Sequence, residues 1–364
     1  MLDTFDLKIC IEPLLAWFAG HARVLPWRSD PTPYKVWVSE IMLQQTRVEA
    51  VKPYFERFVR ELPDIAALSV CPEDRLLKLW EGLGYYNRVR NLQAAARQIM
   101  TEHGGAMPSD FEALRKLKGI GSYTAGAIAS IAFGQKAAAV DGNVLRVLTR
   151  LTEDPTDITK LDFRQKMEDM LTEVMPEGRC GEFNQALMEL GATVCVPNGD
   201  PQCGICPWVN ICLAHQNGKE NEYPIKARKK PRRIEEKTIL LIRDGERMVL
   251  RKRPEKGLLA GLYEFPSEKG FLTEAEAVKA VEKLGFAPLR VQQLPEAKHI
   301  FTHVEWHMKG FLVRVAETEA VPKGMLLANR EETERKYPIP SAYASFKYAL
   351  ETNVDTKTQR RTKS

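Results

Sequence analysis

Four cysteines near the middle of the chain limit most strongly what this sequence can fold into. Cys195, Cys203, Cys206 and Cys212 form a C-x7-C-x2-C-x5-C array. Four thiolates this close can complete a tetrahedral site, either for structural zinc or for an iron–sulfur cluster, and spacing does not separate the two. In a reducing compartment such a group favours a metal site over disulfides. The scattered Cys10, Cys71 and Cys180 are expected to be buried, small apolar residues.

The length of 364 residues suits two domains, and 44% hydrophobic with 28% charged residues is typical of a soluble globular protein. No apolar run reaches the roughly 18–20 residues that a membrane helix needs. The N-terminal MLDTFDLKIC lacks the features of a secretion signal, so a cytoplasmic protein without a membrane partner is expected. The net charge of +5 permits nucleic-acid binding without requiring it.

A change in periodicity divides the chain. Residues 5 to about 215 show apolar residues at helical spacing, whereas Thr238–Ile242 and Met248–Leu250 read as strands around a turn. A helix is expected near 273–284, and strands near 299–303 and 305–316. The sequence therefore predicts four segments: a helical domain over 1–217, a basic linker over 218–235, an α+β domain over 236–352 and a disordered tail over 353–364. The six basic residues within 226–233 fit a solvated connector, or one that also touches phosphates.

A glycine-rich turn in the helical half carries the first functional signal. Gly119, Gly121 and Ser122 lie between a helix expected at 110–117 and another at 124–133. Backbone N–H groups at such a turn can hold a phosphate, although a glycine-rich helix connection is commonly structural. The pattern over about 110–133 is similar to a helix–hairpin–helix, which grips the DNA backbone without reading sequence.

Two acidic residues occupy informative positions. Asp141, followed by Asn143, precedes a helix expected at 144–151, where it is either an ordinary helix cap or a carboxylate at the mouth of a site. Glu40 lies in an otherwise apolar helical stretch, either on the solvated face or partly buried with a raised pKa that suits a proton donor. The polar segment Gln44–Gln45–Thr46 that follows could enter a DNA helix.

Taken together, the motifs resemble the endonuclease III-like superfamily of base-excision glycosylases, and within it the adenine DNA glycosylase family. The resemblance covers nearly the whole chain. Its pieces are PWR 26–28, SEIMLQQT 39–46, WEGLGYYNRVRNL 80–92, LKGIGSYTAGA 117–127, VDGNVLRVL 140–148, FNQALMELGATVC 183–195 and the cysteine array. The first cysteine interval has seven residues here, where the family most often has six.

The resemblance implies roles for individual residues. Glu40 would be the acid, and Asp141 the carboxylate that stabilises the sugar cation or attacks it. Tyr123 and Asn143 would orient Asp141 and the sugar. Tyr123 stands where related lyases carry a nucleophilic lysine, so strand cutting is not expected. The adenine pocket would be formed by Trp27, Arg28, Leu43 and Gln185. DNA contacts would come from Gln45, Thr46, Tyr85, Gly119, Gly121 and Ser122. Tyr85 either enters the duplex or is a packed aromatic residue.

The second domain resembles a Nudix-type domain, through the stretch from Arg251 to Pro266. The helix expected at 273–284 lacks the glutamate cluster with which Nudix hydrolases hold magnesium, so we expect a fold that has lost the hydrolase chemistry. In the adenine glycosylases this domain recognises 8-oxoguanine through a Phe-Ser-His segment. The matching residues here are Phe301, Thr302 and His303, although the same residues could be only the start of a strand.

The fold class expected from this resemblance has two domains. An all-α helix–hairpin–helix glycosylase domain with an iron–sulfur subdomain precedes a C-terminal α+β Nudix-like domain. The resemblance implies one 4Fe–4S cluster, with structural zinc as the alternative, and a monomer that acts on duplex DNA containing adenine opposite 8-oxoguanine or guanine, at the bacterial nucleoid. Three rivals remain: a thymine-directed bifunctional glycosylase, a non-catalytic DNA- or metal-binding module, and an active Nudix hydrolase fused to a DNA anchor.

Overall fold

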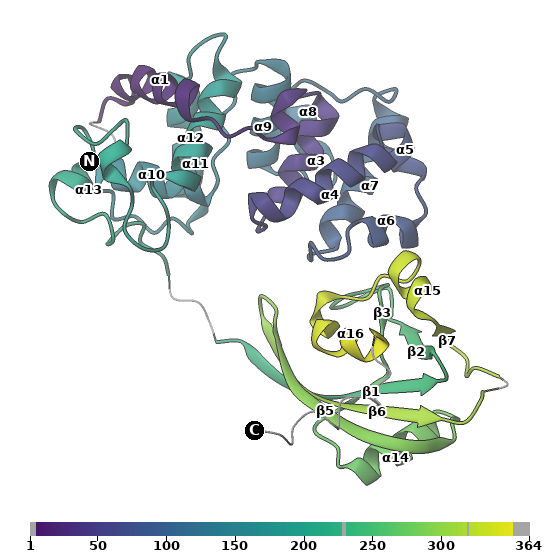
Figure 1. Cartoon of the computed structure of the whole chain (residues 1–364). Coiled ribbons are helices and arrows are strands. Elements are labelled where there is room, and N and C mark those ends of the chain that lie inside the picture. Colours follow the sequence, from purple (N-terminus) through teal and green to yellow (C-terminus); the bar gives the residue numbers. More distant parts are fainter. Residues whose placement is uncertain (1–4, 228–230, 319, 352–364) are drawn as a thin grey trace. The chain divides into compact units, whose positions relative to one another are not determined.

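The computed structural model describes residues 5–227, 231–318 and 320–351, and divides the chain into two compact units (Figure 1). The first unit comprises Met1–Cys71 and Asn87–Lys229, and the second comprises Pro72–Tyr86 and Lys230–Ser364. The first is helical and the second contains a sheet, as the sequence predicts.

Helices build the whole described part of the first unit, which confirms the helical interpretation of residues 5 to about 215. None of the described helices is long and apolar enough to cross a membrane. The α-helices are α1 Ile11–His21, α2 Pro26–Ser29, α3 Pro33–Leu43, α4 Val48–Glu61, α5 Ile65–Val70, α7 Asn87–Glu102, α8 Phe111–Lys116, α9 Ser122–Phe133, α10 Gly142–Thr152, α11 Leu161–Val174, α12 Cys180–Thr193 and α13 Leu213–Gln216, with 3-10 turns η2 Leu7–Cys10 and η3 Cys203–Ile205.

Local sequence signals fix the helix ends that later matter for the site. The Thr32 side chain accepts a hydrogen bond from the Lys35 N–H, and Pro33 occupies the first turn of α3, where its missing N–H costs nothing. Between α8 and α9, Gly119 has a φ of +78°, and a Cβ there would lie 2.6 Å from Asn91 Cβ. Only glycine fits this tight turn, so the hairpin predicted near 110–133 is formed.

One apolar core ties α1, α10, α11 and α12 to the cysteine-rich segment. Its fully buried members include Leu14, Leu145 and Leu187, and Trp208 belongs to it from the loop between Cys206 and Cys212. The Trp208 indole N–H donates to the Cys10 carbonyl at 2.9 Å, which fastens this loop to the N-terminal helix. The cysteine segment is therefore an integral part of the first unit.

A mixed sheet with the order β3-β2-β1-β6-β5 forms the second unit, with β4 paired to β1 and β7 paired to β2. Strands β1 and β6 are parallel, and the other pairs are antiparallel. The strands are β1 Arg233–Asp244, β2 Arg247–Lys252, β3 Tyr263–Glu264, β4 Ser267–Lys269, β5 Pro288–Ile300, β6 Val304–Val315 and β7 Met325–Ala328. The helices are α6 Glu73–Leu79, α14 Glu274–Lys283, α15 Arg330–Arg335, η4 Ser341–Tyr343 and α16 Ala344–Glu351.

Both faces of this sheet are covered, because alternate residues of β1 point to opposite cores. Leu240 and Ile242 pack with Val281 of α14 on one face. Ile239 and Leu241 belong to the core on the other face, which includes Tyr343 and Phe346. Figure 1 shows α14 and α16 on these opposite faces.

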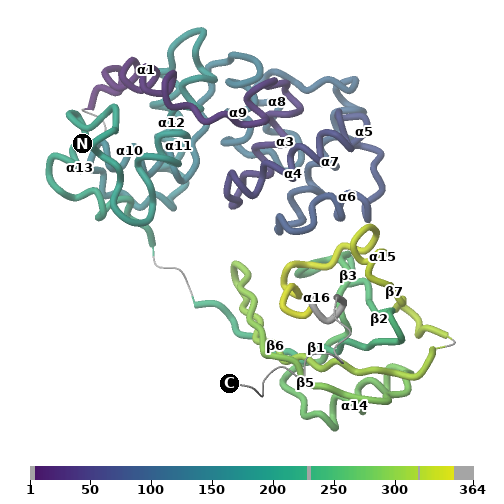
Figure 2. Tube along the Cα trace, in the orientation of Figure 1, coloured from purple at the N-terminus to yellow at the C-terminus, as the bar shows by residue number. Residues whose placement is uncertain are grey.

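The strand predicted near 299–303 is wrong. Strand β5 ends at Ile300, and residues 301–303 form the turn that leads into β6, closed by the Phe301 N–H bonding to the Val304 carbonyl at 2.8 Å. The long β5–β6 hairpin is visible in the Cα trace (Figure 2). Most of β5 was not predicted because its side chains are largely exposed and polar, as at Gln292 and Gln293, which gives little period-two alternation.

The boundaries of the units also differ from the sequence-based ones. The Ile225 carbonyl accepts a bond from Ile158 and β1 begins at Arg233, so the connector predicted over 218–235 is shorter. The segment Pro72–Tyr86 belongs to the second unit. One of its contacts there is a hydrogen bond from the Lys78 ammonium to the Thr333 carbonyl at 2.7 Å. The predicted tail 353–364 lies outside the described residues.

Candidate active site and cysteine cluster

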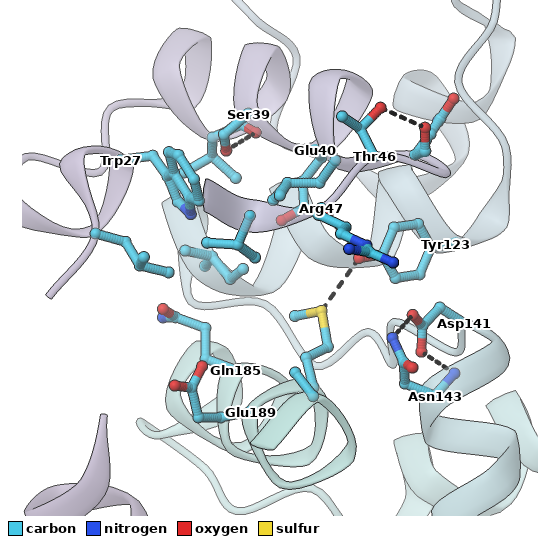
Figure 3. Close-up of a pocket in the computed structure, with 18 of the residues that line it drawn as sticks. Trp27, Ser39, Glu40, Thr46, Arg47, Tyr123, Asp141, Asn143, Gln185 and Glu189 are labelled. Atoms are coloured by element: carbon cyan, nitrogen blue, oxygen red, sulfur yellow. Dashed lines mark hydrogen bonds between the residues drawn. The ribbon is translucent and has the colours of Figure 1, made fainter. Parts of the chain in front are cut away.

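A single cavity of about 680 Å³ in the first unit brings together all the predicted catalytic and adenine-pocket residues and two of the predicted DNA-contacting residues. They come from α2, α3 with the turn after it, the start of α9, the start of α10, and α12. Figure 3 shows several of these side chains facing the same space. The predicted residues that line the cavity are Trp27, Arg28, Glu40, Leu43, Gln45, Thr46, Tyr123, Asp141, Asn143 and Gln185.

Glu40 is buried, with 5% of its surface exposed, so it does not lie on a solvated helix face. The Tyr123 hydroxyl donates to its Oε2 at 2.6 Å and also lies 3.1 Å from Met188 Sδ. Burial raises the pKa of Glu40 to about 7, although the Tyr123 hydrogen bond works in the opposite direction. A carboxyl group with this pKa can carry a proton near neutral pH.

Asp141 has a different environment at the N-terminus of α10. Its Oδ1 accepts a bond from the Asn143 N–H at 2.8 Å, and its Oδ2 accepts from Asn143 Nδ2 at 2.7 Å (Figure 3). The Val144 N–H also donates to Oδ1, at 2.8 Å. Burial raises its pKa, while these bonds and the charge of Arg146 oppose the rise. Asp141 is thus a helix cap that also faces the cavity, and every donor around it favours the ionised form.

The guanidinium of Arg28 is held at the edge of the cavity by two acceptors. It donates to Glu189 Oε2 at 2.8 Å and to the Arg23 carbonyl at 3.1 Å, and it lies over the Phe18 ring. Glu189 is 1% exposed and also binds Arg23 in a two-pronged pair. Burial alone would raise the pKa of Glu189, but the Arg23 bond and the charge of Arg28 outweigh it and lower the pKa.

Sequence reasoning missed Glu189, Met188 and Arg23, which also line the cavity. It missed Arg88 too, whose guanidinium donates to the carbonyls of Ile41, Met42 and Gln44 and so holds the end of α3. The helical spacing from Gln185 to Glu189 was an available signal, because residues four apart share one helix face. Nothing in the sequence around Arg88 indicates its three carbonyl partners.

Three of the predicted DNA-contacting residues, Gly119, Gly121 and Ser122, belong to the hairpin and do not line the cavity. Gly121 is the N-cap residue of α9, and the Ser122 hydroxyl donates to Glu168 Oε1 at 2.8 Å. Their placement at the start of α9 leaves backbone N–H groups of the first helical turn without intrahelical partners.

The remaining predicted residues lie in the second unit. Thr302 and His303 are exposed in the turn between β5 and β6, and Phe301 is half-buried against the Trp306 ring. Tyr85 is 50% exposed with a φ of +48°, and its hydroxyl lies 3.2 Å from Thr302 Oγ1. The structure therefore joins two residues that the sequence separates by more than two hundred positions.

The four cysteines of the array line one small cavity together with Arg150, His215 and Glu220, and none of the four forms a disulfide. Burial raises the pKa of Cys203 to about 11 and that of Cys206 to about 12, so bare thiolates are disfavoured and a bound metal would be needed to hold them ionised. An all-sulfur donor set fits an iron–sulfur cluster or zinc. Glu220 and His215 lie beside Cys203, and these three are a second possible donor group.

Comparisons with known proteins agree with this architecture. Residues 38–173 match the family model of the HhH-GPD superfamily base excision DNA repair proteins, and residues 238–346 match that of the NUDIX domain. The adenine DNA glycosylase of Mus musculus is 36% identical over 83% of this chain and 70% of its own length. That of Buchnera aphidicola (subspecies Schizaphis graminum) is 33% identical over 83% of this chain and 87% of its own.

Among solved structures, a thermostable thymine-DNA glycosylase is 28% identical, with a TM-score of 0.53 over 58% of this chain and 96% of its own. The helical fold predicted from the sequence and its Nudix-like partner are thus both confirmed. Because the adenine DNA glycosylases of the two organisms above each match 83% of this chain, the chain belongs to the adenine DNA glycosylase family.

Proposed function

We propose that this protein is a monofunctional glycosylase that removes adenine lying opposite 8-oxoguanine or guanine in duplex DNA. The observation that carries the proposal is a pair of carboxyl groups on one cavity with different partners. Burial raises the pKa of Glu40 to about 7, whereas Asp141 accepts three N–H hydrogen bonds that oppose the rise in pKa caused by its burial. Such a pair is what an acid-assisted cleavage of a glycosidic bond requires. The family relationship supplies adenine as the base.

In the proposed reaction, protonated Glu40 gives its proton to N7 of the adenine. The electron pair of the bond between N9 and the sugar then leaves with the base, and the sugar becomes an oxocarbenium ion. Ionised Asp141 stabilises that cation, or bonds to it transiently, until water adds and releases a proton. Asn143 holds Asp141 through two N–H groups, and the Tyr123 hydroxyl orients Glu40.

No lysine lines the cavity, whose residues are all described. A bifunctional lyase needs an amine to form a Schiff base with the sugar. The position that carries that lysine in related lyases is Tyr123, and its hydroxyl is bonded to Glu40. We therefore expect hydrolysis without strand cutting.

The adenine must leave the base stack before the reaction, which costs about a few kcal/mol. Trp27, Arg28, Leu43 and Gln185 would receive it, since all four line the cavity. Arg28 is oriented for this task by Glu189 and the Arg23 carbonyl. Gln45 and Thr46 follow α3 on the same cavity wall and would enter the duplex near the opposite base.

Recognition of the opposite base is assigned to the β5–β6 turn. The Thr302 hydroxyl is exposed and would bond to N7–H or O8 of 8-oxoguanine, with His303 supporting the loop or binding a phosphate. The contact between Tyr85 and Thr302 supports a shared role of these residues at one base. The hairpin of Gly119, Gly121 and Ser122 would hold the DNA backbone through its N–H groups.

We also propose that Cys195, Cys203, Cys206 and Cys212 hold one 4Fe–4S cluster. They are the four sulfur donors that line one small cavity. The cluster would supply a structural cross-link for the loop that carries Trp208, and no step of base release passes through it. We expect the protein to act as a monomer on double-stranded DNA in the cytoplasm.

The proposal is tested with duplexes that carry adenine opposite 8-oxoguanine, guanine, cytosine or thymine, each incubated with and without alkali. Base release opposite 8-oxoguanine and guanine, with strand breaks appearing only after alkali, is the expected result. Breaks without alkali would contradict the monofunctional assignment. Release of thymine from a mispaired duplex, with none of adenine, would contradict the substrate.

A further inference from the structure

Two arginines lie one turn apart on α10, between the carboxylate cavity and the cysteine cluster. Arg146 and Arg150 are each 3% exposed. A guanidinium in such a position has lost its water and needs a compensating anion, because an uncompensated buried charge is strongly destabilising. The partners of Arg150 show which group could act as its compensating anion.

The hydrogen bonds of Arg150 go to neutral acceptors and to one cysteine. Its Nε donates to the Tyr223 carbonyl at 3.0 Å, and its Nη1 donates to the Val196 carbonyl at 2.9 Å and to Cys195 Sγ at 3.3 Å. Over the residues that the structure describes, no ion pair joins Arg150 to a carboxylate. The sulfur of Cys195 is therefore its one ionisable partner there.

Two half-buried guanidinium groups of the chain pair with buried carboxylates instead: Arg28 pairs with Glu189, and Arg253 pairs with Glu264. The site around Arg150 instead places it on the same small cavity as all four cysteines of the array. In addition, the Arg150 carbonyl accepts a bond from Cys212 Sγ at 3.5 Å, so both ends of the residue contact the cluster ligands.

We propose that Arg150 is the counter-ion of the iron–sulfur cluster, which it retains in the protein and whose reduction potential it raises. Thiolate ligands give the cluster a net negative charge, and a charge-assisted bond to Cys195 Sγ stabilises that charge. Because reduction adds a further negative charge, a fixed cation stabilises the reduced form more than the oxidised form. The inference rests on the cofactor assignment of the proposed function and goes beyond it.

The test compares Arg150→Met, which removes the charge at similar volume, with Arg150→Lys, which keeps it. The control is Arg179→Met, because Arg179 lies on the surface and pairs with Glu182. Iron and sulfide per chain, the decay of the visible absorption band under a chelator, and the midpoint potential are measured on the full chain. None of these readouts depends on base release.

We expect Arg150→Met to lose its cluster about tenfold faster than the wild type and to shift the midpoint potential down by about 59 mV, a tenfold change for one electron. Arg150→Lys should stay near the wild-type potential, and Arg179→Met should match the wild type throughout. Unchanged retention and potential in Arg150→Met would overturn the proposal, and so would zinc without iron in the wild type.

If Arg150→Met is purified without any cluster, the lysine variant decides the matter. A loaded Arg150→Lys beside an empty Arg150→Met supports the charge argument, whereas an empty site in both contradicts it. Failure of the proposed function gives a different signature. In that case the wild type would hold its cluster and respond to Arg150→Met as expected, yet release no adenine from any duplex.

Discussion

The carboxylate cavity of the first unit and the β5–β6 turn of the second unit differ in burial, and the difference suits the two roles proposed for them. Glu40 is buried among packed helices and its pKa is raised, whereas Thr302 and His303 are exposed in a short turn. A group that transfers a proton must be tuned by its surroundings, and tuning requires burial. A group that reads a base must be reachable, so one exposed hydroxyl is sufficient.

This contrast predicts effects of different size. Removing a buried acid deletes a step of the reaction and should cost about a hundred- to ten-thousandfold in rate. Removing one exposed hydrogen bond should cost about 1 kcal/mol, or several-fold. Substitutions in the two regions test whether chemistry and recognition are separated in this way.

The largest effect is expected for Glu40→Gln, which keeps the shape of the side chain and removes the transferable proton. Single-turnover base release should fall about a thousandfold or more, while DNA affinity in a gel-shift titration stays near that of the wild type. Glu153→Gln is the control, since Glu153 is 6% exposed but does not line the cavity. A near-normal rate for Glu40→Gln would remove it from the role of acid.

A slightly smaller loss is expected for Asp141→Asn. The amide keeps one acceptor oxygen for the cap of α10 but loses the negative charge that would stabilise the sugar cation. Base release should fall about a hundredfold or more by the loss of this electrostatic stabilisation. The melting temperature of the variant should be measured beside its rate of base release. A large drop in melting temperature would mean that the lower rate comes from loss of the helix cap instead.

The pH dependence of base release gives an intermediate test. Glu40 must be protonated to act as the acid and its pKa is about 7, so the rate should be highest below that pH. Above it, the protonated fraction and the rate should fall about tenfold per pH unit. Single-turnover rates are measured on both sides of neutrality. A flat profile across the pKa of Glu40 would show that another group supplies the proton.

How far the sequence predicts this site depends on the range of the interactions. Glu40 and Asp141 were predicted as site residues through the family resemblance of the short motifs that contain them, and the cap of α10 is a local feature. Helical spacing from Gln185 could have placed Glu189 on the cavity side of α12, but its ion pairs could not be predicted, because its arginine partners lie more than a hundred and sixty positions away. A glutamate in Leu187–Met188–Glu189–Leu190 reads as an ordinary surface residue of a helix until those partners are known.

The second unit shows the same limit for its fold. Strand β1 was predicted in part because the run Thr238–Ile242 is apolar and buried on both faces of the sheet. Strand β5 pairs with β6, and its sequence shows no apolar alternation from which a strand could be predicted. The sequence placed Phe301–Thr302–His303 on a strand for this reason, although the turn is what exposes Thr302.

The smallest effect is expected for Thr302→Ala, and it is the sharpest test of the comparison. Loss of one exposed hydroxyl should reduce the preference for 8-oxoguanine over guanine several-fold, by about 1 kcal/mol, and leave the rate at saturating enzyme unchanged. Thr302→Ser keeps the hydroxyl without the methyl group and should retain the preference. Competition between the two duplexes measures the ratio directly. A drop in the saturating rate would instead mean that the turn takes part in the chemistry, and unchanged discrimination would place recognition of the oxidised base on other residues.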